Sequence, residues 1–253
     1  MVAAYRLPAL LLLLLLPALA IGQAEPPQAS GNNDPFERFN RKVFAFNDGT
    51  DRLLIRPVAR GWERVTSPEV RTVVGNFFGN LRMPLSAAHA LLQGKPQVAG
   101  RNLQRFGINT TVGLLGLFDP ASTFGVLGQQ EDMGQTLAVW GMPEGPYLVL
   151  PFIGPSSGRD ALGGTVETFT DPAAVYARSQ GDYRPILLEL INLRTQFFQT
   201  ERYIQDAYDP YTFVRDAFRQ RRLYAIHDGE PPPELLEQFL MPEDDPADLL
   251  LDD

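Results

Sequence analysis

Residues 67–92, SPEVRTVVGNFFGNLRMPLSAAHALL, contain the strongest helical pattern of the chain and decide its fold class. Apolar residues recur there at spacings of three and four: Val70, Val73, Val74, Phe77, Phe78, Leu81, Leu85, Ala88, Leu91 and Leu92. This spacing places them on one wide face of an α-helix. Ser67-Pro68 is a typical helix start, and Pro84 predicts a kink or restart. Gly75 and Gly79 form a G-x-x-x-G step, a weak motif that permits close backbone approach.

The segments before and after this helix continue the pattern. Asp34-Pro35 is typical of a helix start, because aspartate caps free amides and proline fits a first turn. It precedes FERFNRKVFAFND (36–48), whose aromatic residues mostly fall on one helical stripe. Pro57 predicts that residues 51–65 form two short pieces. Gly94 and Pro96 predict a stop followed by a further helix over about 96–112.

Glycine and proline occur every few residues between 113 and 158, where the helical pattern is lost. YLVLPF (147–152) is the one convincing strand-like run and predicts a small hairpin. From Ile186 to Tyr208 the spacing again predicts an amphipathic helix, ended near Asp209-Pro210, and a last helix covers about 210–226. We therefore predict a mainly α protein with one short strand or hairpin segment and no internal repeat.

The composition excludes several kinds of chemistry. The chain of 253 residues has no cysteine, which excludes disulfides, thiolate metal sites and a cysteine nucleophile. Its two histidines, His89 and His227, are too few for a His-rich metal site. It has no HExxH motif, no Walker loop and no G-x-G-x-x-G after a strand. We expect no metal, no cofactor and no nucleic-acid partner, and we interpret His89 as a structural residue.

The formal net charge of −8 is concentrated at the C-terminal end. Residues 228–253 contain ten carboxylates and no Lys or Arg, whereas residues 34–110 contain twelve bases and six acids. One interpretation is a solvated acidic tail beside an ordinary basic surface. The other is that the basic half meets anionic lipid or an acidic partner while the tail stays in water.

The first twenty residues, MVAAYRLPALLLLLLLPALA, are typical of a secretory signal peptide. Arg6 supplies the positive charge, and Ala18-Leu19-Ala20 supplies the cleavage site. The apolar run is shorter than the ~20 residues that span a bilayer, and an uncleaved anchor is the alternative. We expect a signal peptide over 1–20, a flexible linker over 21–33, one domain over 34–229 and an acidic, disordered tail over 230–253.

One motif suggests catalysis. GPSSG (154–158) matches G-x-S-x-G, which in an esterase presents the serine, here Ser156, as a nucleophile followed in the chain by an acid and a histidine. His227 is the only histidine downstream. However, the esterase fold needs several strands before this turn, and residues 34–112 have a helical pattern. A Gly/Pro turn is therefore the better interpretation, and we predict that the protein is not an enzyme.

Six segments together resemble the MlaA (VacJ) family in consistent order, from about residue 34 to 229. They are DPFERFNRKVFAFND, DRLLIRPVARGW, PEVRTVVGNFFGNLRMPLSAAHALLQGKP, GLFDPAS, MGQTLAVWGMPEGPYLVLPFIGPSSGRDALG and DPYTFVRDAFRQRR. In the family, GPYLVLPF-x-GP-x-x-x-RD is a fixed block, which accounts for Ser156 without catalysis. Arg159-Asp160 matches the RD of that block.

The resemblance implies a ring of amphipathic helices with a central channel, lying on the periplasmic face of a Gram-negative outer membrane. Such proteins remove misplaced phospholipid from the outer leaflet and pass it to a soluble periplasmic carrier (MlaC). They also associate with trimeric porins. Typical members are lipoproteins with a cysteine after the signal, and this chain has no cysteine. If the family role holds, attachment must come from helices embedded in the leaflet or from a porin.

The residues proposed to act on lipid are of two kinds. The candidate lipid-contacting or packing residues are Phe44, Phe46, Phe77, Phe78 and Leu81. The candidate head-group contacts are Arg38, Arg41 and Lys42, since cationic side chains suit phosphate. The stretch from Met133 to Gly145 is expected to form a mobile loop beside the channel. The alternative functions are a structural adaptor that only binds a porin or another envelope partner and, less favoured, the serine hydrolase.

Overall fold

The computed structural model describes residues 34–240, and the expected signal peptide, the linker and the end of the acidic tail lie outside the described residues. The elements are α1 (Glu37–Thr50), η1 (Asp51–Ile55), α2 (Arg56–Val65), α3 (Pro68–Leu92), α4 (Pro96–Thr111), α5 (Pro120–Thr123), α6 (Met133–Val139), β1 (Tyr147–Leu150), β2 (Gly154–Ser157), α7 (Gly158–Thr170), α8 (Pro172–Gln180), α9 (Arg184–Gln196), α10 (Glu201–Gln205), α11 (Pro210–Ile226) and α12 (Pro233–Leu240). The prediction of a mainly α protein with one short hairpin is confirmed.

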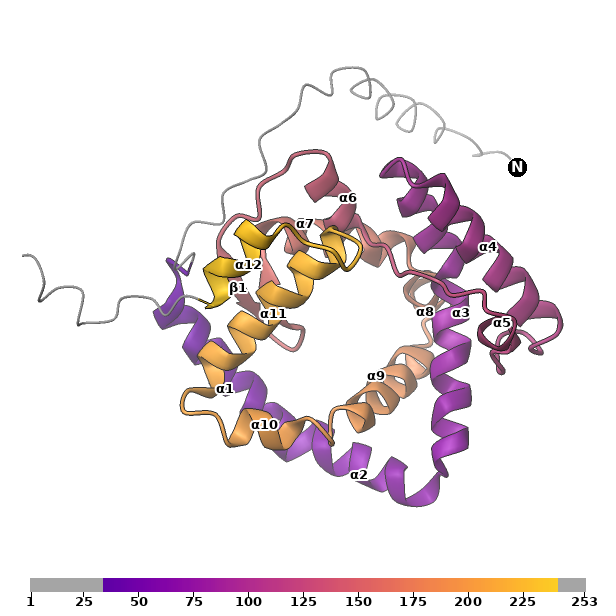
Figure 1. The fold of residues 1–253 in the computed structure, drawn as a ribbon. Coiled ribbons are helices and arrows are strands. Elements are labelled where there is room, and N and C mark those ends of the chain that lie inside the picture. The colour runs from indigo at the N-terminus through magenta and orange to yellow at the C-terminus, as the bar shows by residue number, and fades with distance from the viewer. Residues whose placement is uncertain (1–33, 241–253) are drawn as a thin grey trace, which may run out of the picture.

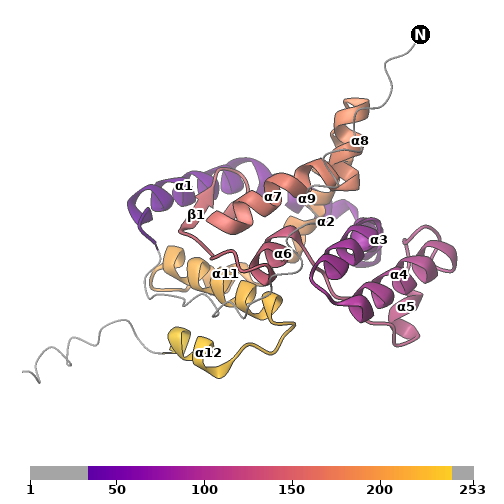
Figure 2. The ribbon, with the colours of Figure 1, turned by 90° about the horizontal axis from the view of Figure 1, so that it is seen from above.

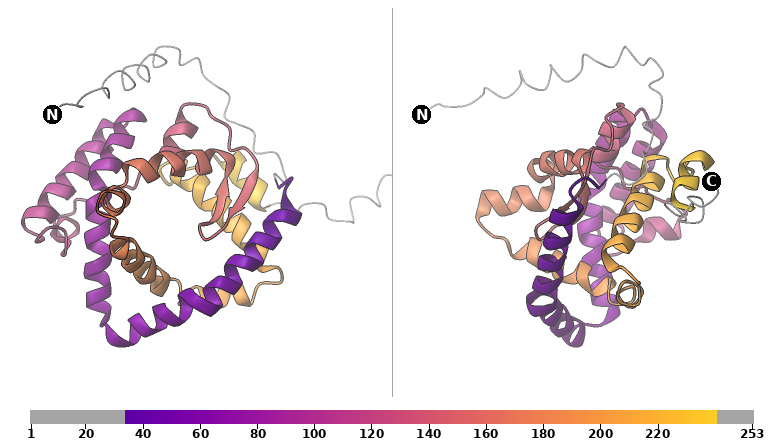
Figure 3. Two further views of the ribbon diagram at one scale, coloured as in Figure 1. Left: turned by 180° about the vertical axis from the view of Figure 1, so that it is seen from behind. Right: turned by 90° about the vertical axis from the view of Figure 1, so that its left-hand side faces the viewer.

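The helices follow one another around a ring (Figure 1). In that view α1, α2 and α3 occupy the left, bottom and right sides, α6 and α7 lie at the top, and α8 lies on the right beside α3. From there α9 to α11 return to the left side. Figure 2 shows that α8 projects from one face of the ring and α12 from the other, and Figure 3 shows the ring again from behind. The ring-like course of the backbone agrees with the expected architecture, while a passage for lipid through it stays a prediction.

The first side of the ring is one uninterrupted helical rod. Residues 51–65 form two short pieces, as expected, η1 and α2, but these follow α1 without a break. η1 is a π turn, in which the amide of Arg56 donates to the carbonyl of Asp51. Pro57 lies in the first turn of α2, directly after the π turn, and has no N–H with which to continue the backbone hydrogen bonds of the rod. Nor does Asp34 cap α1, since its carboxylate accepts from Asn40 and Tyr211 instead.

α3 forms over the residues that its sequence pattern predicts. Ser67 begins it by accepting a hydrogen bond from the amide of Val70 at 3.4 Å. The helix does not restart at Pro84, which lies inside its 25 residues. Only one of the two glycines of the G-x-x-x-G step is close to a neighbour. A Cβ on Gly75 would lie 3.7 Å from Gln196 Nε2, at the contact with α9, whereas a Cβ on Gly79 would meet open space.

The predicted hairpin is present and packs on α1. β1 and β2 are antiparallel, with Tyr147 opposite Ser157 and Leu150 opposite Gly154. Its inner residues Tyr147 and Val149 join Val43 and Tyr211 in a small buried cluster. The hairpin therefore packs against both α1, the first helix of the chain, and α11 (Figure 1).

Three expectations for the second half need correction. Residues 133–139 form α6, not part of a mobile loop, because Asp132 caps the helix by accepting from the amide of Gln135 at 2.7 Å. The helix expected from Ile186 to Tyr208 is divided into α9 and α10, since the chain turns at residues 197–200. α12 lies in the segment that was expected to be a disordered tail.

Much of the apolar surface stays exposed. The second buried cluster contains only small side chains and one valine: Ala87, Ala90, Val98 and Ala99 between α3 and α4. Large apolar side chains such as Leu53, Val65 and Ile153 are 78%, 79% and 77% exposed. A soluble monomer rarely exposes this much apolar surface without an interaction that covers it.

Candidate functional site

A cavity of about 350 Å³ lies between α1–η1, the hairpin, the end of α9, α10 and α11. These elements meet on the lower left of the ring in Figure 1. The lining includes charged, aromatic and aliphatic side chains: Phe44, Asn47, Asp48, Asp51, Arg56, Val149, Gly154, Pro155, Arg194, Phe197, Glu201, Ile204, Gln205 and Val214.

Two arginines and two carboxylates form one ion-pair network on this lining. Arg194 Nε and Nη2 donate to the two oxygens of Asp51 at 2.7 and 2.8 Å. Arg56 Nε lies 3.3 Å from the same carboxylate, and its Nη2 contacts Glu201. Arg194 Nη2 lies 3.5 Å from Glu201, so each arginine contacts both acids. The network joins the π turn η1 to α9 and α10.

The network keeps its members charged. Burial would raise the pKa of Asp51, but the hydrogen bonds and charges of Arg194 and Arg56 together hold that pKa below its usual value. The hydrogen bonds from Arg194 to Asp51 raise the pKa of the guanidinium. One donor of the network stays unused: Arg194 Nη1 is buried and has no hydrogen-bond acceptor within residues 34–240.

The rest of the lining is largely apolar. Val149 on β1 is buried, and Phe44 lies edge-on to Tyr211 with ring centroids 5.8 Å apart. Phe197, Ile204 and Val214 add apolar surface from the end of α9, from α10 and from α11. The cavity is therefore amphipathic, which suits a molecule with a charged group at one end and hydrocarbon at the other.

A smaller polar pocket, of about 130 Å³, lies where α6, α7 and α11 meet. Arg222 Nη2 donates to Asp132 at 3.0 Å and to Asp160 at 2.7 Å. Burial alone would raise the pKa of Asp132, but Arg222 and the amide of Gln135 lower it to about 2. The pocket lining has three carboxylates, Asp132, Asp160 and Glu167, and one cation, Arg222, so it is net acidic. The ion pairs of Arg222 join α6, α7 and α11.

The G-x-S-x-G motif does not form a nucleophile elbow. Ser156 is a buried residue of β2 whose hydroxyl donates to the carbonyl of Ser157 at 3.3 Å. Ser157 begins α7 by accepting from the amide of Asp160. His227 lies at the end of α11, with Nδ1 2.9 Å from the carbonyl of Leu223. The motif is strand β2 followed by the first residue of α7, so the expectation of a Gly/Pro turn is wrong.

The five predicted lipid-contacting residues fall in four places. Phe44 lines the amphipathic cavity, whereas Phe46 is half exposed and lies edge-on to Phe152 of the hairpin turn. Phe77 and Phe78 line a separate groove of about 550 Å³ between α3 and α9. Leu81 is half-buried on α3.

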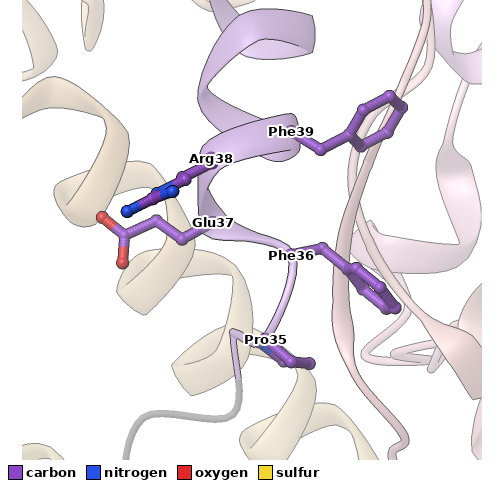
Figure 4. A pocket seen from close by; sticks show the side chains of 5 residues that line it. All are labelled: Pro35, Phe36, Glu37, Arg38 and Phe39. Carbon is purple, nitrogen blue, oxygen red and sulfur yellow. The ribbon is translucent and has the colours of Figure 1, made fainter.

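The three predicted head-group contacts also lie in different surroundings. Arg41 is held by Glu37 at 2.7 Å and by Asp209, and its guanidinium lies over the ring of Tyr211. Arg38 and Lys42 are exposed. Figure 4 shows the first turn of α1, where Phe36 and Phe39 point to one side and Arg38 and Glu37 to the other. None of the three cations lines the amphipathic cavity.

Sequence reasoning missed the cations that do line this cavity, Arg56 and Arg194. Asp51 and Arg194 are 143 positions apart, and no local pattern links them.

Buried His89 on α3 has Nδ1 3.3 Å from the hydroxyl of Thr136, and burial lowers its pKa. Residues 34–240 contain no group of three or more acidic or histidine side chains arranged to hold a metal. In the same range, every helix is too short or too polar to cross a bilayer.

Comparison with known proteins identifies similar chains. The family model described as "MlaA lipoprotein" matches residues 32–225. The "Intermembrane phospholipid transport system lipoprotein MlaA" of Escherichia coli (strain K12) is 32% identical over 210 residues, which are 81% of this chain and 82% of that protein. The protein of the same name from Haemophilus influenzae is 31% identical over 211 residues, 80% of this chain and 83% of the other. An uncharacterized protein of Rickettsia felis is 36% identical over 191 residues, 75% of this chain and 76% of that protein.

A solved structure has a similar fold. It superposes with a TM-score of 0.68 and 31% sequence identity, covering 76% of this chain and 98% of the solved chain. It is described by the words "Structural basis for maintenance of bacterial outer membrane lipid asymmetry".

Proposed function

We propose, from the premise that this chain belongs to the MlaA lipoprotein family, that it is a non-enzymatic component of phospholipid transport between membranes. The single observation that carries the proposal is the amphipathic cavity between α1, α9, α10 and α11. Its ion-pair network offers a polar surface to a head group, while Phe44, Ile204 and Val214 offer an apolar surface to acyl chains. No catalytic step is part of the proposal.

The proposed transport removes misplaced phospholipid from the outer leaflet of the outer membrane and passes it to a soluble periplasmic carrier. A lipid moving past the cavity would keep its head group on the charged side and its chains on the apolar side. Because the arginines of that side are already paired, they contact a phosphate without binding it so tightly that release becomes slow. A trimeric porin is a further proposed partner.

Membrane attachment is proposed to use the exposed apolar side chains. Leu53 and Leu54 of η1 and Val65 of α2 are strongly exposed on the helical rod. The rod also has exposed arginines, as at Arg52, which is typical of helices that lie in the membrane interface. We propose the periplasmic face of the outer membrane as the location, with the ring embedded in one leaflet.

Reconstitution in vesicles tests the transport role. Ile204 lines the cavity, and Tyr203 on the same helix is 69% exposed and does not line it. Ile204→Arg places a charge against the acyl chains, so we expect transfer of labelled phospholipid to an acceptor to fall at least tenfold, because burying an unpaired charge is costly. Tyr203→Arg adds the same charge outside the cavity and should transfer lipid at the rate of the unchanged protein.

Two results would contradict the proposal. One is transfer that Ile204→Arg leaves unchanged while circular dichroism shows the variant folded. The other is a protein that binds a porin or another envelope partner and transfers no phospholipid, which would favour the adaptor. In cells, loss of the protein should raise outer-leaflet phospholipid and sensitivity to detergent.

A further inference from the structure

The lining of the amphipathic cavity contains one more carboxylate than it has guanidinium groups. Its acids are Asp48, Asp51 and Glu201, and its bases are Arg56 and Arg194. Asp51 and Glu201 each contact both arginines, so these four side chains neutralise one another. Asp48 adds a negative charge that no base on the lining neutralises.

The partner of Asp48 lies on the outside of the helix. Arg52, one turn along the chain, contacts both oxygens of Asp48, Nη2 to Oδ2 at 2.7 Å and Nε to Oδ1 at 3.1 Å. The Arg52 side chain is 62% exposed and does not line the cavity. Exposed pairs of this kind are weak, because water and salt screen them. The carboxylate of Asp48 is therefore able to accept a cation that arrives from the cavity.

The same lining has a donor without an acceptor. Arg194 Nη1 is buried and makes no hydrogen bond to any residue from 34 to 240, although Nε and Nη2 of the same side chain are bonded to Asp51. A guanidinium edge is well suited to a phosphate oxygen, which would supply the missing acceptor. The lining thus has one donor without an acceptor and one carboxylate, Asp48, whose partner Arg52 lies outside the cavity.

We propose that this cavity selects zwitterionic head groups, in which an ammonium lies beyond the phosphate as in phosphoethanolamine, over head groups with a net negative charge. The phosphate would contact Arg194, and the ammonium would contact Asp48. A head group such as phosphoglycerol supplies the phosphate but no cation, so the negative charge of Asp48 repels it. This selectivity rests on the proposed function, because it concerns the lipid that the cavity passes.

The test measures a ratio within one transfer reaction. The full chain is reconstituted in vesicles with equal amounts of labelled phosphatidylethanolamine and phosphatidylglycerol that have identical acyl chains. The unchanged protein should transfer the ethanolamine lipid about three- to tenfold faster, the effect of one charge at a partly hydrated site. Asp48→Asn should bring the ratio close to one, and Asp48→Lys should reverse it.

Asp206→Asn is the matched control. Asp206 also forms an exposed pair one turn from its arginine, with Arg202 on α10, but it does not line the cavity. This variant removes the same charge from the protein and should keep the ratio of the unchanged chain. A comparison of Asp48→Asn with Asp206→Asn separates the effect of a charge on the cavity lining from the effect of the protein's net charge on vesicle binding.

Each result decides between the two proposals. Normal total transfer with a ratio near one in the unchanged protein, or a ratio that Asp48→Lys does not alter, would overturn the selectivity and leave the transport role intact. An equal loss of selectivity in Asp206→Asn would also overturn it. Absence of any lipid transfer by the folded, unchanged protein would overturn the transport role itself.

Discussion

Asn40 is fully buried inside α1, a position that asparagine occupies at a cost unless its amide is satisfied. Its Nδ2 donates to Asp34 at 2.8 Å and to the carbonyl of Tyr147 at 3.0 Å, and its Oδ1 accepts from the amide of Val149 at 2.9 Å. Asn47, two turns later, makes similar bonds to Leu150 and to Phe152. Two amides on one face of α1 therefore hold the hairpin that borders the amphipathic cavity.

Replacement of Asn40 tests this role. Asn40→Ala leaves the buried carbonyl of Tyr147 and the buried amide of Val149 without partners, so we expect the free energy of unfolding to fall by about 1–3 kcal/mol. Asn47→Ala should cost less, because its bonds are nearer to solvent, where water replaces the lost partner. Urea unfolding followed by circular dichroism measures both. Equal stabilities of Asn40→Ala and the unchanged protein would contradict the assignment.

At the scale of elements, α6 and α7 cross at two glycines. A Cβ on Gly163 would lie 2.6 Å from the backbone nitrogen of Gly134, and a Cβ on Gly134 would lie 2.3 Å from an oxygen of Asp160. This close approach allows Asp132 before α6 and Asp160 in α7 to share Arg222 from α11. The position of three helices thus depends on two residues that lack a side chain.

The next residue of α7 supplies the control for that contact. Gly163→Ala must push α6 away from α7, and we expect it to lower the free energy of unfolding by about 1–3 kcal/mol. Gly164→Ala meets open space, and because alanine favours helices it should raise the stability by up to about 1 kcal/mol. Thermal or urea unfolding of the two variants checks the prediction. If Gly163→Ala were more stable than Gly164→Ala, the close contact between α6 and α7 would not contribute to stability.

At the scale of the whole molecule, apolar surface is exposed where the backbone is also strained. Leu114 and Leu115, between α4 and α5, have φ values of 53° and 60° and are 61% and 68% exposed. Leucine is unfavourable in this left-handed conformation, which asparagine tolerates better. The exposed pair agrees with the proposal that the ring lies in a leaflet, because lipid would cover these side chains.

The double variant Leu114→Asn, Leu115→Asn separates membrane binding from folding. Stability in buffer should stay equal or rise, since asparagine suits the backbone at both positions. Binding to vesicles, measured by co-flotation, should fall about tenfold or more, because two buried leucine side chains contribute roughly 1.5–3 kcal/mol each. Unchanged flotation of the folded variant would place this part of the ring outside the bilayer.

Local chemistry by itself determined most of the elements. The spacing of apolar residues over 67–92 and 210–226, with capping Ser67 and Asp209, specified α3 and α11, because periodicity and capping depend on neighbours in the chain. The family segments, which run through these elements, also indicated the family from sequence alone. Local patterns misjudged α6 and the break between α9 and α10, although both features use hydrogen bonds between near neighbours in the chain. The amide of Gln135 donates to Asp132 at the start of α6, and the amide of Thr200 donates to the carbonyl of Phe197 at the break.

The cavity and its charges were decided only by the tertiary structure. Asp51 and Arg194 form their bidentate pair across 143 positions, and Asn40 reaches Tyr147 across 107. The sequence pattern favours the cations nearest the aromatic stripe of α1, yet Arg41 is already bound to Glu37 and Asp209. A sequence specifies which side chains can pair, but only the closed ring determines which of them are paired and which still face a ligand.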